Sequence, residues 1–411
     1  MKAVVFHGIG DIRLEEVDDP KIENPTDAIV RITASAICGT DLHMIRGTMA
    51  GMKPGTILGH EGVGIVEEVG PEVRNLSAGD RVVIPSTIAC GYCVYCRAGY
   101  YAQCDNANPY GPHAGTAFFG GPEESGPFHG LQAEKARIPF ANVGPVKLPE
   151  EVSDDQAILL SDIFPTGFFG AELAEIKAGD TVAVFGCGPV GQFTIVSARI
   201  FGAGRIIAVD TIRSRLEMAQ ENGAEIIDYN AEDPVESIRK LTGGIGVDRA
   251  IDAVGIDANL PHEGPAAKQA NNQKPLFEQE LREVAPETHP EGPNWHPGDA
   301  PSIVLQWAVK ALAKAGTLSV IGVYPQKAQF FPVGAAMNKN LTIKMGNCNH
   351  RKYLPMLVDM VRSGMVDPEK VLAQTHYEPF GSAIDAYKAF DQRQPGWIKV
   401  VLEPAEVLAS R

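Results

Sequence analysis

Four cysteines that lie close together have the clearest chemical meaning in the sequence. They are Cys90, Cys93, Cys96 and Cys104, separated by two, two and seven residues. Thiolates at this spacing can surround one tetrahedral zinc ion at about 2.3 Å, and four protein ligands leave no position for a substrate. The pattern predicts a structural zinc that clamps a loop over residues 88–105. Two disulfides or an iron–sulfur cluster are the alternatives, and disulfides do not suit a reducing compartment.

A second set of zinc-type ligands lies earlier in the chain. Cys38-Gly-Thr-Asp-Leu-His43 contains a thiol and Gly59-His-Glu61 contains an imidazole, and zinc binds both groups well. Taken alone, a buried cysteine and a single histidine are more often structural than metal-binding. A third ligand must come from elsewhere, so these residues by themselves leave a catalytic zinc open.

A glycine-rich turn follows a predicted strand at 181–185 and opens a predicted helix over about 189–201. It reads Gly186-Cys-Gly-Pro-Val-Gly191, and Asp210 ends the next predicted strand, 19 residues after the last glycine. Such glycines let the backbone approach a pyrophosphate at the helix N-terminus. A carboxylate at position 210 would bind the adenosine ribose and repel a 2′-phosphate, which favours NAD over NADP. The alternative is an ordinary strand-to-helix turn with an incidental aspartate.

The elements that must position these residues fall into two kinds. From Ala28 to about Pro85, short β-rich runs alternate with glycine turns, which indicates an irregular β domain. From about Thr181 to Met345, buried-type strands alternate with helices, as in a doubly wound parallel α/β sheet. Eight prolines between Pro261 and Pro301 predict an insertion outside the core, over 258–301, with one or two helical turns over 276–284.

The composition excludes several kinds of partner. A chain of 411 residues can bury two or three cores. Its formal net charge of -15 opposes binding to nucleic acid or to an anionic membrane. Acidic residues soon after the short apolar N-terminal run do not fit a secretory signal, and no apolar stretch is long enough to span a membrane. We therefore expect a cytoplasmic protein with a small-molecule substrate.

Taken in order, the motifs resemble the zinc-dependent medium-chain alcohol dehydrogenases. They are Cys-Gly-Thr-Asp-Leu-His, Gly-His-Glu-Gly-Val-Gly, the four-cysteine loop and Gly-x-Gly-Pro-Val-Gly. The segment from Ser161 to Ala171 is similar to the glutathione-independent formaldehyde dehydrogenase branch. The resemblance implies a GroES-like catalytic domain over 1–162 and a Rossmann cofactor domain over 163–324. Residues 325–411 would complete the sheet and return to the catalytic domain.

The resemblance also implies roles for individual residues. It makes Cys38, His60 and Asp162 the ligands of a catalytic zinc, although many relatives have cysteine in place of Asp162. Glu61 would be an adjacent carboxylate, and Asp41 the partner of the metal-bound histidine. A proton path would run from the Thr40 hydroxyl through the cofactor ribose to His43. The residues implied to contact NAD are Thr166, Gly186, Gly188, Pro189, Val190, Gly191, Asp210, Arg215, Val254, Ile321, Val323 and Lys399.

The expected function is therefore hydride transfer between an alcohol or aldehyde and NAD, with one catalytic and one structural zinc per chain. A formaldehyde dehydrogenase or an aldehyde dismutase that retains its NAD is an alternative within this class. A zinc hydrolase or a non-catalytic nucleotide-binding protein would belong to another class. Because relatives are often dimers or tetramers, we expect a homo-oligomer, with a tetramer favoured.

Overall fold

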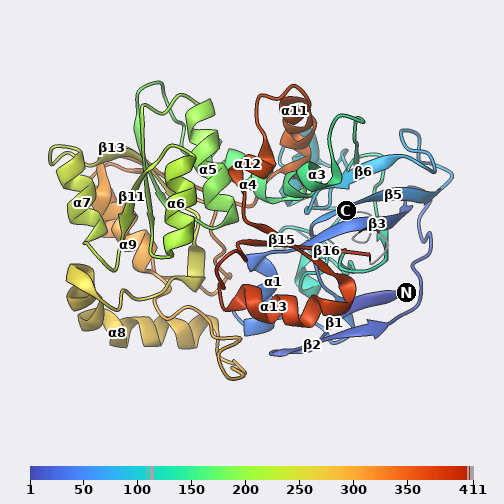
Figure 1. The fold of residues 1–411 in the computed structure, drawn as a ribbon, viewed down its shortest axis with the longest axis horizontal. Coiled ribbons are helices and arrows are strands. Elements are labelled where there is room, and N and C mark those ends of the chain that lie inside the picture. Colours follow the sequence, from blue (N-terminus) through green and yellow to red (C-terminus); the bar gives the residue numbers. More distant parts are fainter. Residues whose placement is uncertain (109, 112–114, 405–406, 408–411) are drawn as a thin grey trace. The chain divides into compact units, whose positions relative to one another are not determined.

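A computed structural model describes residues 1–108, 110–111, 115–404 and 407, and its ribbon is drawn in Figure 1. Two compact units divide the chain. The first comprises Met1–Pro165, Thr288–Trp295 and Cys348–Arg411, and the second comprises Thr166–Glu287 and His296–Asn347. Across the described residues, no helix is both long enough and apolar enough to cross a membrane.

The first unit is built on antiparallel β-structure. A three-stranded sheet has the order β2-β1-β4, with β2 at Asp11–Glu16, β1 at Lys2–Gly8 and β4 at Thr56–Ile57. The larger sheet has the order β15-β16-β3-β5-β6-β8, with β7 also paired to β3. Its strands are β15 (Thr375–Pro379), β16 (Lys399–Glu403), β3 (Ala28–Ile37), β5 (Gly62–Val69), β6 (Arg81–Ile84), β8 (Val146–Lys147) and β7 (Lys135–Ile138). Only the β15–β16 pair of this sheet is parallel among the described strands.

Two helix ends in this unit position chemically important side chains. Helix α1 (Gly39–Arg46) follows β3 directly, and the Asp41 carboxylate accepts a hydrogen bond from the Cys38 N–H at 2.9 Å, which fixes the start of the helix. Helix α3 (Asp154–Ser161) begins at Ser153 with a capping box to Gln156 and ends at Asp162. The sequence therefore places Cys38 just before one helix and Asp162 just after another.

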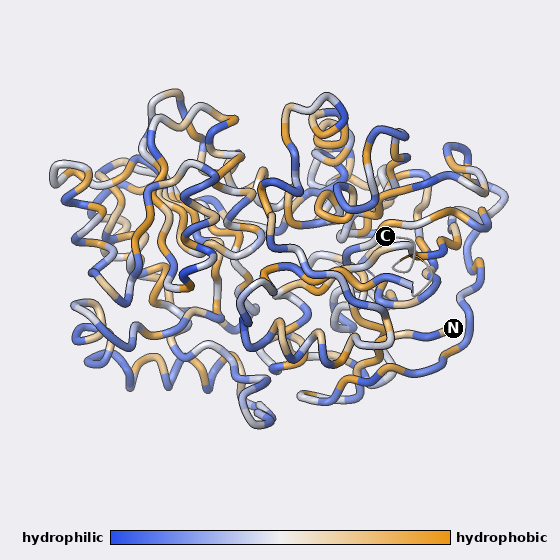
Figure 2. Tube along the Cα trace, in the orientation of Figure 1, coloured by the Kyte–Doolittle hydropathy of each residue, from blue (hydrophilic) through white to orange (hydrophobic). Residues whose placement is uncertain are grey.

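The second unit contains a six-stranded parallel sheet, which confirms the predicted doubly wound α/β fold. Its order is β11-β10-β9-β12-β13-β14, and the apolar character of these strands is visible in Figure 2. The strands are β11 (Glu225–Asp228), β10 (Arg205–Asp210), β9 (Thr181–Phe185), β12 (Val247–Asp252), β13 (Leu312–Val320) and β14 (Thr342–Met345). Helices α4 (Ile163–Leu173), α5 (Pro189–Ile200), α6 (Arg213–Glu221), α7 (Pro234–Leu241) and α9 (Ile303–Ala311) accompany them. The strand order reverses between β9 and β12, where ligands bind in sheets of this kind.

The proline-rich insertion is more ordered than the sequence indicates. Helix α8 runs over Gly264–Val284, 21 residues, instead of one or two turns over 276–284. Its prolines do not prevent this, because Pro265 lies in the first turn, where no N–H bond is lost, and the helix continues through Pro275. Phe277 and Trp295 are also core residues, 0% and 1% exposed, so the expectation that the insertion lies outside the core is wrong.

Candidate active site and metal centres

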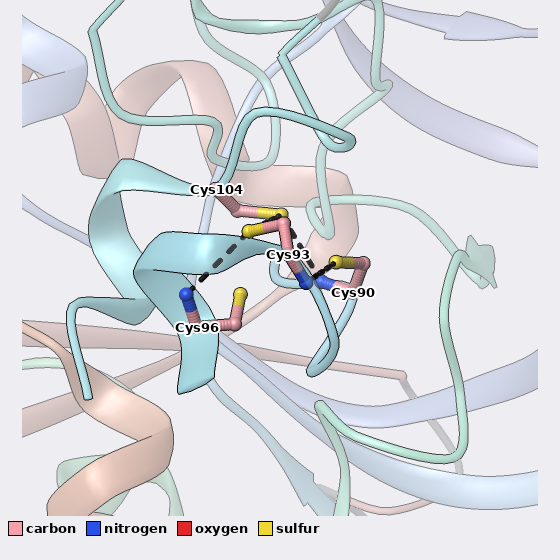
Figure 3. Close-up of side chains that lie close together, drawn as sticks. All are labelled: Cys90, Cys93, Cys96 and Cys104. Atoms are coloured by element: carbon pink, nitrogen blue, oxygen red, sulfur yellow. Dashed lines mark hydrogen bonds between the residues drawn. The ribbon is translucent and has the colours of Figure 1, made fainter. Parts of the chain in front are cut away.

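The four cysteines of the 88–105 loop form one compact cluster. Their sulfur atoms all lie within 4.8 Å of one another, and Figure 3 shows them converging from helix α2 (Val94–Arg97) and the flanking loop. Zinc–sulfur bonds of about 2.3 Å define a tetrahedron with edges of about 3.8 Å, so this spacing suits one zinc ion. The Sγ atoms of Cys93 and Cys104 are 4.0 Å apart, too far for a disulfide, and these cysteines are free.

Backbone N–H groups point at these sulfurs and favour the thiolate form. Cys90 Sγ accepts from the N–H of Cys93 at 3.3 Å, and Cys104 Sγ accepts from the N–H of Cys90 at 3.2 Å. Burial would raise the pKa of Cys93, but hydrogen bonds from the N–H groups of Cys96 and Asp105 and from the Cys96 and Cys90 side chains outweigh burial and lower that pKa to about 7. Burial raises the pKa of Cys96 and of Cys104. The chemistry of this donor set therefore fits a structural zinc.

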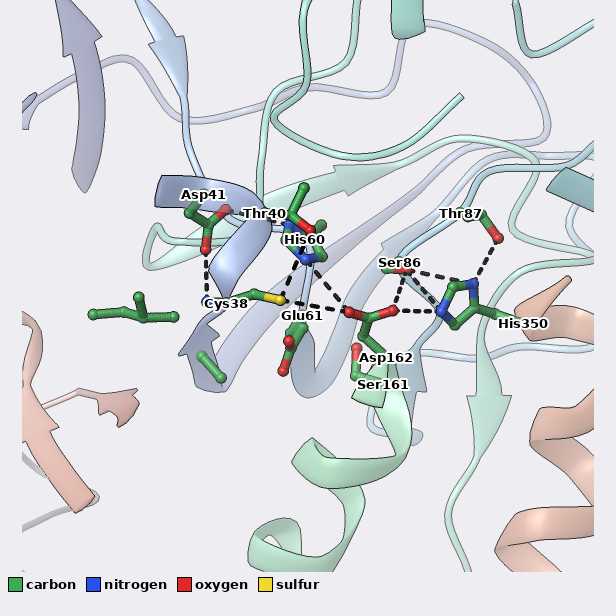
Figure 4. Close-up of polar contacts among 12 residues, drawn as sticks. Cys38, Thr40, Asp41, His60, Glu61, Ser86, Thr87, Ser161, Asp162 and His350 are labelled. Atoms are coloured by element: carbon green, nitrogen blue, oxygen red, sulfur yellow. Dashed lines mark hydrogen bonds and ion pairs between the residues drawn. The ribbon is translucent and has the colours of Figure 1, made fainter. Parts of the chain in front are cut away.

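The second cluster brings together the side chains expected for a catalytic metal. Ligand atoms of Cys38, His60, Glu61 and Asp162 lie within 4.8 Å of one another. Cys38 Sγ is 3.7 Å from Asp162 Oδ2, and His60 Nε2 is 3.5 Å from the same oxygen. Figure 4 shows the thiol, the imidazole and the carboxylate directed toward one another.

The His60 ring shows that this cluster suits a cation. Both ring nitrogens are buried, and each lies at ion-pair distance from a carboxylate oxygen, without hydrogen-bond geometry. Nδ1 lies 3.2 Å from Asp41 Oδ1, so Nε2 is the nitrogen that faces Cys38 and Asp162. Burial lowers the pKa of His60, but Asp41 and Cys38 outweigh burial and hold that pKa well above its usual value. The ring is surrounded by acidic groups that a metal ion would balance.

Lys399 forms a buried ion pair with Glu61 beside the second cluster. Its Nζ is 2.6 Å from Glu61 Oε1 and 2.5 Å from Oε2, and it also donates to the Ile37 carbonyl at 3.2 Å. Neither side chain of this pair is exposed to solvent. Burial lowers the pKa of Lys399, but Glu61 and Cys38 outweigh burial and raise it, so the lysine stays charged. In the first unit Lys399 thus neutralises a buried carboxylate beside the cluster, and its expected contact with NAD stays a prediction.

One residue at the cluster was not anticipated from the sequence. His350 Nε2 is 2.5 Å from Asp162 Oδ1, and Ser86 Oγ donates to the same oxygen at 3.1 Å. Burial would raise the pKa of Asp162, but His350 and His60 outweigh burial and hold that pKa well below its usual value. His350 and Asp162 are 188 residues apart, so no local pattern could reveal the contact.

Thr40 and His43, the residues expected to carry a proton, both lie on α1. Thr40 Oγ1 is 3.9 Å from Cys38 Sγ. His43 is 4% exposed, and its Nδ1 is 2.8 Å from the hydroxyl oxygen of Thr48. The Thr48 hydroxyl also donates to the His43 carbonyl at 3.2 Å, so its oxygen can accept a hydrogen bond from Nδ1–H. That tautomer would leave Nε2 as the basic ring nitrogen.

In the second unit, the glycine turn has the close backbone approach that its sequence predicts. A Cβ atom on Gly191 would lie 1.9 Å from the Gly186 carbonyl oxygen, and Gly186 itself has φ +91°, so side chains are excluded at both positions. Asp210 Oδ2 accepts from the Cys187 N–H at 2.7 Å, and Oδ1 accepts from the Thr211 N–H at 2.7 Å. The turn and the carboxylate at the end of β10 are thus held together.

The other residues expected to contact a cofactor also belong to this unit. Val254 packs on Gly186, and Arg215 lies beside Gly188. The N–H of Ile256 donates to the Val323 carbonyl, which joins the ends of β12 and β13. The full set in this unit is Thr166, Gly186, Gly188, Pro189, Val190, Gly191, Asp210, Arg215, Val254, Ile321 and Val323. Lys399 belongs to the first unit.

Comparisons with known proteins decide the family. Residues 24–150 match the model of the alcohol dehydrogenase GroES-like domain, and residues 189–262 match that of the zinc-binding dehydrogenase. A zinc-type alcohol dehydrogenase-like protein of Bacillus subtilis, AdhB, is 38% identical over 408 residues, 98% of this chain and 100% of that protein. The chain belongs to the zinc-dependent medium-chain alcohol dehydrogenase family. The predicted GroES-like and Rossmann fold is thereby confirmed.

Two further proteins are similar to this member of the alcohol dehydrogenase family, one in structure and one in sequence. Alcohol dehydrogenase TADH from Thermus sp. ATN1 has a similar structure over 98% of this chain and 100% of that chain, with a TM-score of 0.78 and 33% sequence identity. A glutathione-independent formaldehyde dehydrogenase of Pseudomonas aeruginosa is 37% identical over 268 residues, 62% of this chain and 66% of that protein. Membership of the alcohol dehydrogenase family supports an oxidoreductase that acts on small molecules.

Proposed function

We propose that this protein transfers hydride between an alcohol or aldehyde and NAD, with Cys38, His60 and Asp162 holding a catalytic zinc. The proposal rests on the different surroundings of Glu61 and of the three donors Cys38, His60 and Asp162. Glu61 lies beside the three donors, but Lys399 is within 2.6 Å of both its carboxylate oxygens. Three protein ligands leave the fourth position of a tetrahedral zinc open, as in catalytic zinc sites. Zinc bound there would supply the Lewis acidity that lowers the pKa of a substrate hydroxyl.

The charges of the donor set support the same assignment. With zinc bound, a thiolate on Cys38 and a carboxylate on Asp162 would balance the two charges of Zn²⁺, and His60 would bind as the neutral ring. Asp41 Oδ1 lies 3.2 Å from His60 Nδ1, where it favours the tautomer that leaves the Nε2 lone pair toward the cluster. Glu61 and Lys399 cancel each other, while the Asp41 carboxylate adds one negative charge beside His60.

The proton of the substrate hydroxyl must reach solvent, and we propose that Thr40 and His43 form the two ends of its path. The Thr40 hydroxyl is half-buried near Cys38, and His43 keeps a basic Nε2 because its Nδ1–H faces Thr48. The cofactor ribose would connect them. His43→Ala should reduce turnover in a pH-dependent way, and an external base should restore part of it. An unchanged rate profile across pH would remove His43 from the path.

Asp210 supports NAD as the preferred cofactor. Its carboxylate is fixed at the turn by backbone N–H groups, where its negative charge would repel a 2′-phosphate. We expect kcat/KM to be at least about tenfold higher with NAD than with NADP, a difference of about 1.4 kcal/mol. Asp210→Ser should lower the ratio of kcat/KM with NAD to kcat/KM with NADP. Equal use of both cofactors by the natural protein would contradict the assignment.

A formaldehyde dehydrogenase or aldehyde dismutase that retains NAD is the second candidate, favoured by the similarity to the Pseudomonas aeruginosa formaldehyde dehydrogenase. In dismutation one aldehyde is oxidised and another reduced on the same NAD, so no cofactor is consumed. Purified protein would then release NAD on denaturation and convert formaldehyde to formate and methanol without added cofactor. Protein that is free of NAD and inactive until NAD is added would exclude this version.

The central test of the proposal combines metal analysis with turnover. Natural protein should hold two zinc ions per chain, and adding an alcohol with NAD should produce the absorbance of NADH. Cys38→Ala should retain one zinc, lose turnover and still bind NADH. The matched control is Cys348→Ala, which removes a buried cysteine outside both clusters. A Cys38→Ala variant with two zinc ions and full activity would refute the assignment. Absence of any nicotinamide signal across a broad panel would favour a hydrolase or a non-catalytic protein.

We also propose that the protein is a homo-oligomer, with a tetramer favoured. The support lies in the second unit, where Val333, Met337 and Met345 are 64%, 76% and 62% exposed. Met345 ends β14, which is an edge strand of the six-stranded sheet. An exposed edge with apolar side chains is typical of a surface covered in an assembly. Light scattering on the purified protein measures its molar mass and decides this.

A further inference from the structure

His350 is the first residue of α11 (His350–Arg362), and its ring is fixed on three sides. Nε2 lies 2.5 Å from Asp162 Oδ1 and 3.0 Å from Ser86 Oγ, while Nδ1 lies 3.1 Å from Thr87 Oγ1. His350, Ser86 and Thr87 are all buried, with 3%, 3% and 6% of their surface exposed. Figure 4 shows the ring on the side of Asp162 opposite to Cys38 and His60.

The two oxygens of the Asp162 carboxylate have different surroundings. Oδ2 faces the cluster, 3.7 Å from Cys38 Sγ and 3.5 Å from His60 Nε2. Oδ1 faces away from it and receives both the His350 ring and the Ser86 hydroxyl. A carboxylate whose outer oxygen is occupied in this way has only one oxygen left for a metal.

The partners of His350 are themselves anchored. The N–H of Ser86 donates to the carbonyl of Ser161, the residue before Asp162, at 3.2 Å. Asn349, the residue before His350, accepts a hydrogen bond from the Ala102 N–H at 2.9 Å, between Cys96 and Cys104. Thr87 can donate to Nδ1, which leaves the proton on Nε2 for Asp162, so the arrangement needs no charge on the ring.

We infer that His350 is a positioning residue that keeps Asp162 a one-oxygen ligand of the catalytic zinc. The inference rests on the proposed function, because it assumes zinc at the Cys38 cluster. If Oδ1 also bound the metal, the carboxylate would occupy the position that a substrate oxygen needs. Hydrogen-bond partners of metal ligands are typically worth about 10- to 100-fold in metal affinity or activity, which sets the expected effect.

The test compares His350→Phe with His350→Gln, which keeps a donor, and with His376→Phe as the matched control. His376 also contacts a carboxylate, Glu378, at 2.9 Å in the same unit, but it lies outside both cysteine-containing clusters. Chelator competition measures the affinity of the zinc at the Cys38 cluster, identified as the ion that Cys38→Ala loses. We expect about a 10- to 100-fold loss for His350→Phe, a smaller loss for His350→Gln and none for the control. Cobalt exchanged into the same position should lose visible absorbance in His350→Phe, because a second Asp162 oxygen raises the coordination number.

The outcomes separate this inference from the proposed function. If the natural protein binds no metal through Cys38, the proposed function itself fails. If the natural protein holds two zinc ions and His350→Phe leaves affinity and cobalt spectrum unchanged, only the role of His350 is overturned. Should His350→Phe not fold, Thr87→Val decides, because it leaves the ring in place and removes its Nδ1 partner. A several-fold loss of zinc affinity supports the inference, and an unchanged affinity overturns it.

Discussion

Replacing Lys399 by methionine tests how the cluster keeps Glu61 apart from the metal. The substitution removes the ammonium group that lies 2.5 and 2.6 Å from the two Glu61 oxygens, in a place where neither side chain is exposed. Removing one partner of a buried ion pair typically costs about 3–5 kcal/mol, since the other charge stays buried and unpaired. A domain has only about 5–15 kcal/mol of stability in total. We therefore expect Lys399→Met to lower the urea midpoint strongly.

A double-mutant cycle shows whether this loss comes from Glu61. Glu61→Gln combined with Lys399→Met leaves no unpaired charge, so the double variant should be more stable than Lys399→Met alone. The assay is urea unfolding of zinc-replete protein followed by circular dichroism. Cobalt exchanged into the cluster gives a second signal, because an unpaired Glu61 can turn toward the metal and close its fourth position. The reasoning about this pair is wrong if Lys399→Met is as stable as the natural protein. It is also wrong if the double variant is no more stable than Lys399→Met.

Three further perturbations follow from other parts of the structure. Cys96→Ser should leave the protein with one zinc and make the 88–105 loop sensitive to proteases, and intact resistance would contradict a clamping role. Trp295→Ala should cost about 3–5 kcal/mol in the first unit, because it empties a fully buried site, and a shift under about 1 kcal/mol would show that the site collapses. Burial raises the pKa of Glu280 above its ordinary value of 4.5, so the folded protein binds that proton more tightly than the unfolded chain and loses stability as pH rises above that value. The stability advantage of Glu280→Met over the natural protein, measured by urea unfolding, should grow between pH 5 and pH 8. A stability difference that does not change with pH would contradict this.

The short-range parts of the site could be predicted from the sequence. The four cysteines span 15 positions, so their spacing alone brings their sulfurs together on one turn and its flanks. The glycine turn and Asp210 end neighbouring parallel strands, whose carboxyl ends must meet at one edge of a sheet. In both cases local geometry fixes the answer, because few residues separate the groups that act together.

Contacts between distant segments could not be predicted in this way. Lys399 and Glu61 are 338 residues apart and meet only because β16 pairs with β3 and β3 pairs with β5. The His350 contact with Asp162 likewise depends on the start of α11 reaching the end of α3. A resemblance assigns a basic residue to a position, but the burial of its charge decides which anion it faces.

The proline content of the insertion does not predict its structure, which is a 21-residue helix over Gly264–Val284. The prolines of α8 are compatible with a helix that buries Ala266, Ala270 and Phe277 along one side. Proline excludes a backbone donor, but it does not stop apolar neighbours at helical spacing from packing. Periodicity was the stronger signal in this segment.

The short stretch Thr288–Trp295 limits how the molecule can be divided in the laboratory. It belongs to the first unit, yet the residues on both sides of it belong to the second, so the chain passes between the units at four points. Asn294 Nδ2 and the Trp295 N–H both donate to Asp391, which also pairs with Arg46 at 2.6 Å. A fragment cut at 166 and 347 would carry this tryptophan without its binding partners and expose a large apolar ring. Expression of either half alone should therefore yield aggregated material, whereas a fragment that replaces 288–295 with a short glycine–serine linker has a better chance of staying in solution.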